Sequence, residues 1–169
     1  MAFQKINIQD LQMNPFTSIG KEWMLITAGN QKKVNTMTAS WGGVGVLWGQ
    51  DVVTAYIRPQ RYTKEFVDQQ ECFSLSFFNG NYKKELGVLG TVSGRDQDKI
   101  KDVDFHVTFI EDVPTFEEAS VVFIVEKIYE DTIQPEYFKD QSLDQKWYPN
   151  KDYHTFYIAK IKAVYVQEA

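Results

Sequence analysis

Cysteine, histidine and basic charge are scarce in this chain of 169 residues, and each scarcity excludes a class of protein. The single cysteine, Cys72, excludes an internal disulfide and a cysteine-rich metal site. The two histidines, His106 and His154, stand in no spacing with Glu or Cys that is typical of metal ligands, so we expect no metal. The net charge of −5 disfavours a nucleic-acid-binding protein, which needs a basic face.

Long hydrophobic runs are missing as well. The longest purely apolar run, residues 121–125, is far too short to cross a bilayer, and the first residues, MAFQK, lack the apolar core of a signal peptide. No internal repeat, low-complexity tract or linker divides the chain. We therefore expect one domain, residues 1–169, in a cytoplasmic protein that binds neither membranes nor nucleic acids.

Aromatic residues, in contrast, make up 15% of the chain, and many lie in runs rich in Val, Ile and Thr, which favours β structure. Such runs predict strands at residues 22–28, 34–40, 52–57, 73–78, 105–110, 120–129 and 153–166. In the last strand, simple alternation places residues 153, 155, 157, 159, 161, 163 and 165 on one face.

Two segments predict short helices. Residues 63–70 have Thr63 as a plausible N-cap, and residues 81–89 carry an apolar stripe that Gly90 is suited to end. Many strands with two short helices between them predict a closed or nearly closed antiparallel barrel. Residues 135–150 hold several aromatic side chains without a regular pattern, so we interpret them as a long functional or interface loop.

Three polar stretches beside predicted strands carry the candidate chemistry. In residues 35–41 (NTMTASW), Thr38 and Ser40 place two hydroxyls on one side of a strand, where they face either a ligand or water. In residues 58–63 (RPQRYT), Arg58 and Arg61 precede a helix start, an arrangement suited to phosphate, although a solvated basic turn has the same pattern. Residues 93–99 (SGRDQDK) form a flexible turn rich in donors, which is a common feature on its own.

Other motifs of this kind are weak or absent. Residues 43–45 (GVG) lack the third glycine of a dinucleotide fingerprint, and no Gly-x-Ser-x-Gly elbow supports a hydrolase. Together the three stretches offer donors and positive charge for a phosphate and flat apolar surface for a conjugated ring. Flavin mononucleotide (FMN) is a common ligand that needs all of these.

In this order the stretches resemble the flavin reductase-like family of FMN-binding split barrels, including the flavoredoxin type. The matching pieces are residues 35–41, 57–66 (IRPQRYTKEF), 73–78 (FSLSFF), 93–99 and 154–158 (HTFYI). The resemblance covers residues 15–165 and implies a mainly β, Greek-key-like antiparallel split barrel with a few short helices. In many relatives a Gly-Glu pair follows the last matched strand, where this chain has Ala159 and Lys160.

The resemblance also implies the site and the activity. Residues that would bind FMN are Asn35, Met37, Thr38, Ala39, Ser40, Trp41, Arg58, Arg61, Tyr62, Thr63, Ser93, Gly94, Arg95, Lys99 and Trp147. His154 is the candidate catalytic residue, placed to position a nicotinamide or relay a proton. The family is typically homodimeric, with a flavin near each subunit interface.

The expected function is an NAD(P)H-dependent flavin oxidoreductase that passes electrons to a small-molecule or protein acceptor. Two alternatives remain open from the sequence. One is a flavoredoxin-like electron carrier without NAD(P)H turnover, and the other is a non-redox barrel that binds a phosphorylated metabolite.

Overall fold

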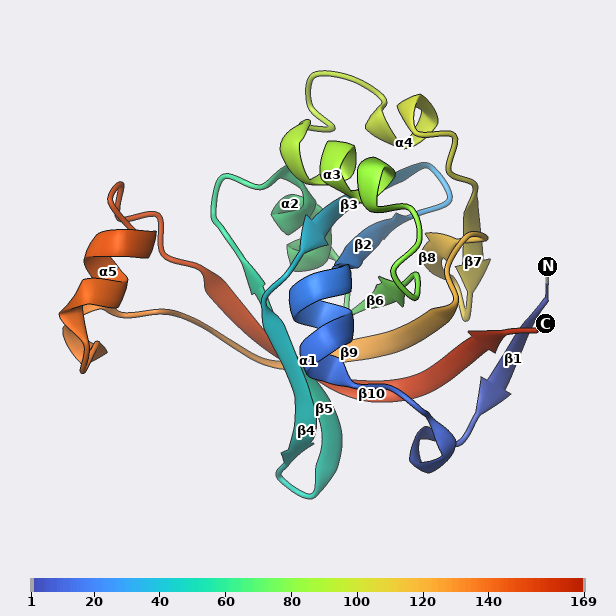
Figure 1. Cartoon of the computed structure of the whole chain (residues 1–169), viewed down its shortest axis with the longest axis horizontal. Helices are drawn as coiled ribbons and strands as arrows, with labels where there is room; N and C mark the ends of the chain where they lie inside the picture. Colours follow the sequence, from blue (N-terminus) through green and yellow to red (C-terminus); the bar gives the residue numbers. More distant parts are fainter. Residues whose placement is uncertain (1, 169) are drawn as a thin grey trace.

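The fold is built on one curled antiparallel sheet. In the computed structural model, which describes residues 2–168, its strands follow the order β3-β2-β6-β9-β10-β5-β4, with β1 paired to the end of β10 (Figure 1). The strands are β1 (Phe3–Ile6), β2 (Met24–Asn30), β3 (Lys33–Ala39), β4 (Gly42–Leu47), β5 (Gln50–Ile57), β6 (Cys72–Phe77), β9 (Val121–Thr132) and β10 (Thr155–Gln167). A separate hairpin pairs β7 (Val107–Ile110) with β8 (Val113–Phe116).

The two edges of the sheet meet at a seam. Strands β3 and β4 stand at opposite ends of the strand order, yet only Ser40 and Trp41 separate them in the chain. Because a link this short spans at most about 11 Å, the sheet has to curl until its edges lie close together. The result is a split barrel whose seam carries the residues between β3 and β4.

Two apolar clusters hold the barrel together. The first fills its interior and includes Met24, Phe73, Phe77, Phe123 and Tyr157. The second lies between the outside of the sheet and its helical and hairpin cover, with Leu25, Leu86, Leu89, Phe105 and Phe116 among its members. The antiparallel strands therefore bury apolar side chains on both faces over part of their length.

The helices are short and gather on one side of the barrel. α2 (Tyr62–Gln69) packs on β2 and β3, α3 (Lys83–Thr91) packs on β3, and α4 (Lys99–Asp102) follows α3. α1 (Pro15–Thr17) runs directly into the π-helical η2 (Ser18–Glu22), and the 3₁₀ turns are η1 (Ile8–Asp10) and η3 (Pro135–Tyr137). α5 (Gln141–Trp147) lies on an arm that extends from the barrel between β9 and β10 (Figure 1). No helix within residues 2–168 is long and apolar enough to cross a membrane.

The structure confirms the mainly antiparallel β fold and corrects several details. Thr63 is not an N-cap: α2 begins at Tyr62, and the buried Thr63 hydroxyl accepts a hydrogen bond from the Asn35 amide instead. Gly90 does not end its helix, because α3 continues to Thr91. The segment 135–150 is not an irregular loop, since it contains η3 and α5.

The face of β10 was also predicted wrongly. Register shifts interrupt its pairing with β9 between Ile158 and Ala159 and between Ile161 and Ala163. Tyr157 and Ala159 therefore face the barrel interior, whereas Ala163 packs in the outer cluster. A bulge changes which face a side chain takes, so simple alternation fails along this strand.

Candidate functional site

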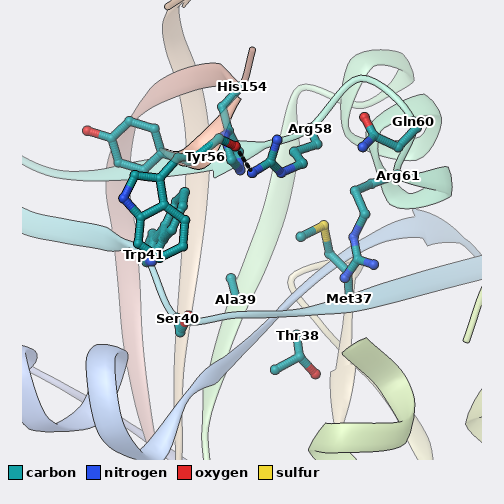
Figure 2. Close-up of a pocket in the computed structure, with 11 residues that line it drawn as sticks. Met37, Thr38, Ala39, Ser40, Trp41, Tyr56, Arg58, Gln60, Arg61 and His154 are labelled. Carbon is teal, nitrogen blue, oxygen red and sulfur yellow. Dashed lines mark hydrogen bonds between the residues drawn. The ribbon is translucent and has the colours of Figure 1, made fainter. Parts of the chain in front are cut away.

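A cavity of about 400 Å³ lies at the seam of the barrel. Its lining comes from the end of β3, the seam, β5 and the turn after it, α5 and the residue before β10 (Figure 2). The lining residues are Met37, Thr38, Ala39, Ser40, Trp41, Tyr56, Arg58, Gln60, Arg61, Trp147 and His154. The structure thus brings together residues of two predicted stretches, 35–41 and 58–63, with Trp147 and His154. No residue of the third stretch, 93–99, lines this cavity.

Of the two hydroxyls at the end of β3 and just after it, that of Ser40 is more accessible to a ligand than that of Thr38. Thr38 Oγ1 donates a hydrogen bond to the carbonyl of Leu86 in α3, at 2.5 Å, so this hydroxyl is already engaged in packing. Ser40 lies in the seam, is exposed and lines the cavity. Its hydroxyl and the backbone groups beside it are available to a ligand.

One end of the cavity is aromatic. The Trp41 ring meets Trp147 edge-on with centroids 5.0 Å apart and lies 5.2 Å from the His154 ring. Tyr56 also packs on His154, with ring centroids 6.4 Å apart. Trp41 remains 38% exposed, so a flat apolar surface faces the cavity mouth. Figure 2 shows Trp41, Tyr56 and His154 grouped at this end.

His154 is a buried, neutral imidazole. The side chain is 7% exposed, and its Nδ1 lies 2.8 Å from the hydroxyl of Tyr148. Burial, reinforced by the positive charge of Arg58, lowers the pKa of His154 to about 4. At neutral pH the ring is therefore uncharged and lines the cavity as a hydrogen-bonding group, not as a cation.

Arg58 fastens the α5 arm to the barrel. Its guanidinium pairs with the Asp152 carboxylate at 2.8 Å and donates to the Trp147 carbonyl, also at 2.8 Å. Gln60 donates to the same carboxylate at 2.6 Å. These contacts hold the arm, and with it Trp147, against the end of β5. The Asp152 pKa is lowered by the Gln60 hydrogen bond and by Arg58.

The opposite end of the cavity, at Arg61, and the hollow behind it, at Lys99, are cationic. Arg61 Nη1 donates to the Gly90 carbonyl at 2.8 Å, and Lys99 Nζ donates to the carbonyls of Leu89 and Val92 at 2.8 and 3.0 Å. These carbonyls belong to the C-terminal end of α3, which carries partial negative charge. Among residues 2–168 neither cation has a carboxylate at ion-pair distance.

The surroundings disfavour the charge of both cations. Burial, with a smaller contribution from the charge of nearby Arg61, lowers the pKa of Lys99 to about 8. The Arg61 pKa is lowered by burial and by Arg58. A buried positive charge whose hydrogen-bond partners are only carbonyls strongly favours the binding of an anion.

The remaining predicted residues lie behind this end, not in the cavity wall. Asn35, Gly94, Arg95 and Lys99 line a neighbouring hollow of about 430 Å³. Within the same region, Arg95 stacks on Tyr62 with 4.7 Å to the ring centroid and pairs with Glu65. The Ser93 hydroxyl accepts from the Arg95 backbone amide at 3.2 Å. Tyr62, Thr63 and Ser93 therefore support the local structure without lining the cavity.

Known structures share this architecture. A flavoredoxin from Methanosarcina acetivorans superposes with a TM-score of 0.64 at 23% identity, over 86% of this chain and 68% of that one. An FMN-binding domain of a flavin reductases-like enzyme from Shewanella baltica OS155 superposes with a TM-score of 0.70 at 14% identity, over 98% and 77%. An FMN-binding protein from Thermus thermophilus gives 0.64 at 22% identity, over 87% and 72%. No family model matches the sequence, and no curated protein matches it significantly.

The chain has the fold of the FMN-binding split barrels. This split barrel carries a further hollow, of about 580 Å³, which shares Ser40, Trp41 and Tyr56 with the cavity. The rest of that hollow is largely apolar and includes Ile19, Val44 and Phe16, whose side chain is 86% exposed.

Three residues of the split-barrel site were missed by sequence reasoning. Tyr56 precedes Arg58 by two positions, so both side chains point to the same side of the chain, and this spacing was a usable signal. Gln60 lies inside the matched stretch 57–66. No sequence pattern indicates Tyr148, because its role depends on how the arm folds against His154.

Proposed function

We propose that the chain binds FMN in the seam cavity and is a flavin-dependent oxidoreductase that uses NAD(P)H as electron donor. One observation carries the proposal: a single cavity has aromatic rings at one end and, at the other, Arg61, whose guanidinium has no carboxylate at ion-pair distance among residues 2–168. A ligand with a flat conjugated ring and an anionic tail matches both ends. The shared fold with FMN-binding proteins supports the same ligand.

The residues present fit such a ligand along its length. The aromatic end, with Trp41 and Tyr56, offers flat apolar surface to an isoalloxazine ring. Ser40 and the seam backbone offer hydrogen bonds to the ring edge and to ribityl hydroxyls. Arg61 is placed for the phosphate, and Lys99 adds charge from behind it.

When bound, FMN supplies the hydride- and electron-accepting chemistry. The side chains of this chain exclude water and position the groups around the ring. Trp41 and Trp147 shield one end of the cavity from water, while Arg58 holds the arm that carries Trp147. His154, which is neutral at pH 7, donates or accepts a hydrogen bond there and does not act as a charged acid.

The electron acceptor and the assembly are part of the proposal. The apolar hollow next to the cavity is a route by which a small-molecule or protein acceptor approaches the ring. We also propose a homodimer, because large side chains such as Phe16, Trp48 and Tyr137 are strongly exposed in the single chain. Size-exclusion chromatography with light scattering tests this, and a monomer at micromolar concentration would contradict it.

Rapid mixing with NADH and NADPH under anaerobic conditions tests the enzyme. Either nucleotide is expected to bleach the visible absorption of the bound FMN at least as fast as the enzyme turns over. The bleaching should be faster with one of the two nucleotides. Stable colour at millimolar NADH and NADPH would contradict the reductase. It would instead favour a flavoredoxin-like electron carrier, a candidate supported by the likeness to flavoredoxin structures.

A third candidate, a barrel that binds another phosphorylated metabolite without redox chemistry, predicts a different result. Such a protein would purify colourless and take up no FMN. Equilibration with FMN followed by gel filtration separates this candidate from the other two.

A further inference from the structure

A buried hydrogen-bonded pair stands beneath the aromatic end of the cavity. The hydroxyl of Tyr148 lies 2.8 Å from Nδ1 of His154, and the two side chains are 6% and 7% exposed. Tyr148 comes from the end of the α5 arm, whereas His154 precedes β10. The pair therefore links the arm to the cavity wall, and its geometry determines where one proton lies.

The tyrosine is the donor in this bond. A buried hydroxyl that fails to donate loses the free energy of a hydrogen bond, and within residues 2–168 Nδ1 of His154 is the acceptor found for the Tyr148 hydroxyl, since the other contact is with the backbone amide of His154, a donor. The reverse arrangement, with Nδ1–H as donor, would leave the phenolic proton without an acceptor. Burial also raises the pKa of Tyr148, so the hydroxyl keeps its proton.

A neutral imidazole carries one N–H, so a ring that accepts at Nδ1 holds its proton at Nε2. The ring is surrounded by Arg58 and Arg61, which oppose a second proton, and by Asp152, which favours one; burial and Arg58 prevail. The imidazole therefore has one donor, Nε2–H, for which the part of the chain that the structure describes, residues 2–168, offers no acceptor, and the ring lines the cavity.

We propose that Tyr148 is a positioning residue that holds His154 as its Nε2–H tautomer, so that His154 presents a neutral hydrogen-bond donor to a carbonyl-type oxygen of a ring bound in the cavity. The ligand part rests on the proposed function, whereas the tautomer does not. A fixed neutral donor stabilises negative charge that develops on such an oxygen and adds no net charge to the site.

Nitrogen NMR of histidine rings tests the tautomer directly, because the chain has two histidines. In ¹⁵N-histidine-labelled protein at pH 7, without FMN, His154 is expected to show protonated Nε2 and a hydrogen-bonded, unprotonated Nδ1. His106→Gln assigns the signals. In Tyr148→Phe, Nδ1 is expected to move clearly downfield, as it does when an accepted hydrogen bond is lost.

Tyr153→Phe is the matched control. Its ring lies 4.8 Å from Tyr148, but its hydroxyl bonds to Asp144, so this variant should leave the His154 signals in place. A protonated Nδ1 in the unmodified chain, or a Tyr148→Phe spectrum that matches the unmodified one, would overturn the proposal. The measurement on the unmodified chain decides the tautomer even if Tyr148→Phe does not fold.

Binding of FMN tests the second part of the proposal, namely that His154 donates a hydrogen bond to the bound ring. Tyr148→Phe should weaken FMN binding about 3- to 10-fold, as the loss of one oriented hydrogen bond would, while Tyr153→Phe should leave it unchanged. Equal affinities for Tyr148→Phe and the unmodified chain would refute a donor that faces the ring. Failure of the unmodified chain to bind FMN would instead refute the proposed function and leave the tautomer result standing.

Discussion

The two ends of the seam cavity differ in how their charges are balanced. At the aromatic end, Arg58 is paired with Asp152 and the buried His154 is neutral and hydrogen-bonded to Tyr148. At the cationic end, Arg61 and, behind it, Lys99 donate to backbone carbonyls, and burial lowers the pKa of both. The charges of the aromatic end are therefore balanced within the chain, whereas the cations of the other end have no carboxylate at ion-pair distance among residues 2–168.

Because of this difference, the two ends should contribute to ligand binding in different ways. An uncharged ring gains from flat apolar surface and a few hydrogen bonds, so many side chains contribute a little each. A phosphate gains from a few charge-assisted bonds that are individually strong. Substitutions at the cationic end should therefore separate FMN from riboflavin, and substitutions at the aromatic end should affect both.

The largest effect is expected from Arg61→Ala. Loss of a charge-assisted hydrogen bond to phosphate should weaken FMN binding about 10- to 100-fold and riboflavin binding less than about 3-fold. Fluorescence titration with both flavins measures the ratio. Lys84→Ala, an exposed cation on α3 away from the cavity, is the matched control and should change neither affinity. Equal losses for FMN and riboflavin in Arg61→Ala would remove Arg61 from the phosphate end.

Lys99→Ala should act in the same direction with a smaller effect, about 10-fold on FMN, because Lys99 lies behind Arg61. Its pKa is about 8, so its ammonium is lost as the pH rises through that value. FMN affinity should therefore fall between pH 7 and pH 9 in the unmodified chain, and this fall should be reduced in Lys99→Ala. Riboflavin serves as the control, and a riboflavin loss as large as the FMN loss would count against the role.

His154 at the aromatic end should make the protein sensitive to acid. Its folded pKa of about 4 lies below the ordinary 6.5, so the unfolded chain takes up the proton first as the pH falls. The free energy of unfolding should drop between pH 6.5 and pH 4, by about 1 kcal/mol at pH 5 after allowance for partial solvent screening. His154→Gln should flatten this part of the urea-denaturation profile and His106→Gln should not. A profile unchanged by His154→Gln would show that the ring is not held neutral.

The smallest effect is expected from Ser40→Val in the seam. Removal of this hydroxyl should loosen FMN and riboflavin alike, about 3-fold, or shift the flavin potential. Titration with both flavins and a reduction with a dye of known potential check this outcome. Unchanged affinity and potential would assign Ser40 to an ordinary exposed position.

The sequence was informative where the local pattern decides the structure. Alternating β-branched and aromatic residues located most strands, but β4 was missed because Gly42, Gly43 and Gly45 weaken its strand pattern. Strand β8 was missed because Pro114 interrupts a run of only four residues. The faces of β10 depend on bulges, which arise from pairing with β9 and leave no local signal.

The same distinction, between what local patterns predict and what long-range contacts decide, holds for the site. Met37 to Trp41, Arg58 and Arg61, which line the cavity, were selected from the sequence because their residue types, taken together, suit a ring with a phosphate tail. Their meeting with His154 depends on the closure of the sheet at the seam, which no local pattern encodes. Lys99 was assigned to the site from the family resemblance and its charge, whereas α4 holds its ammonium against the end of α3.

The central claim is that the seam cavity holds FMN, and the visible spectrum of the protein tests it most directly. After equilibration with excess FMN and gel filtration, the protein fraction should be yellow, carry close to one flavin per chain and show a shifted flavin spectrum. NADH or NADPH should then bleach it under anaerobic conditions. A colourless protein fraction, with all FMN eluting as free flavin, would contradict the account.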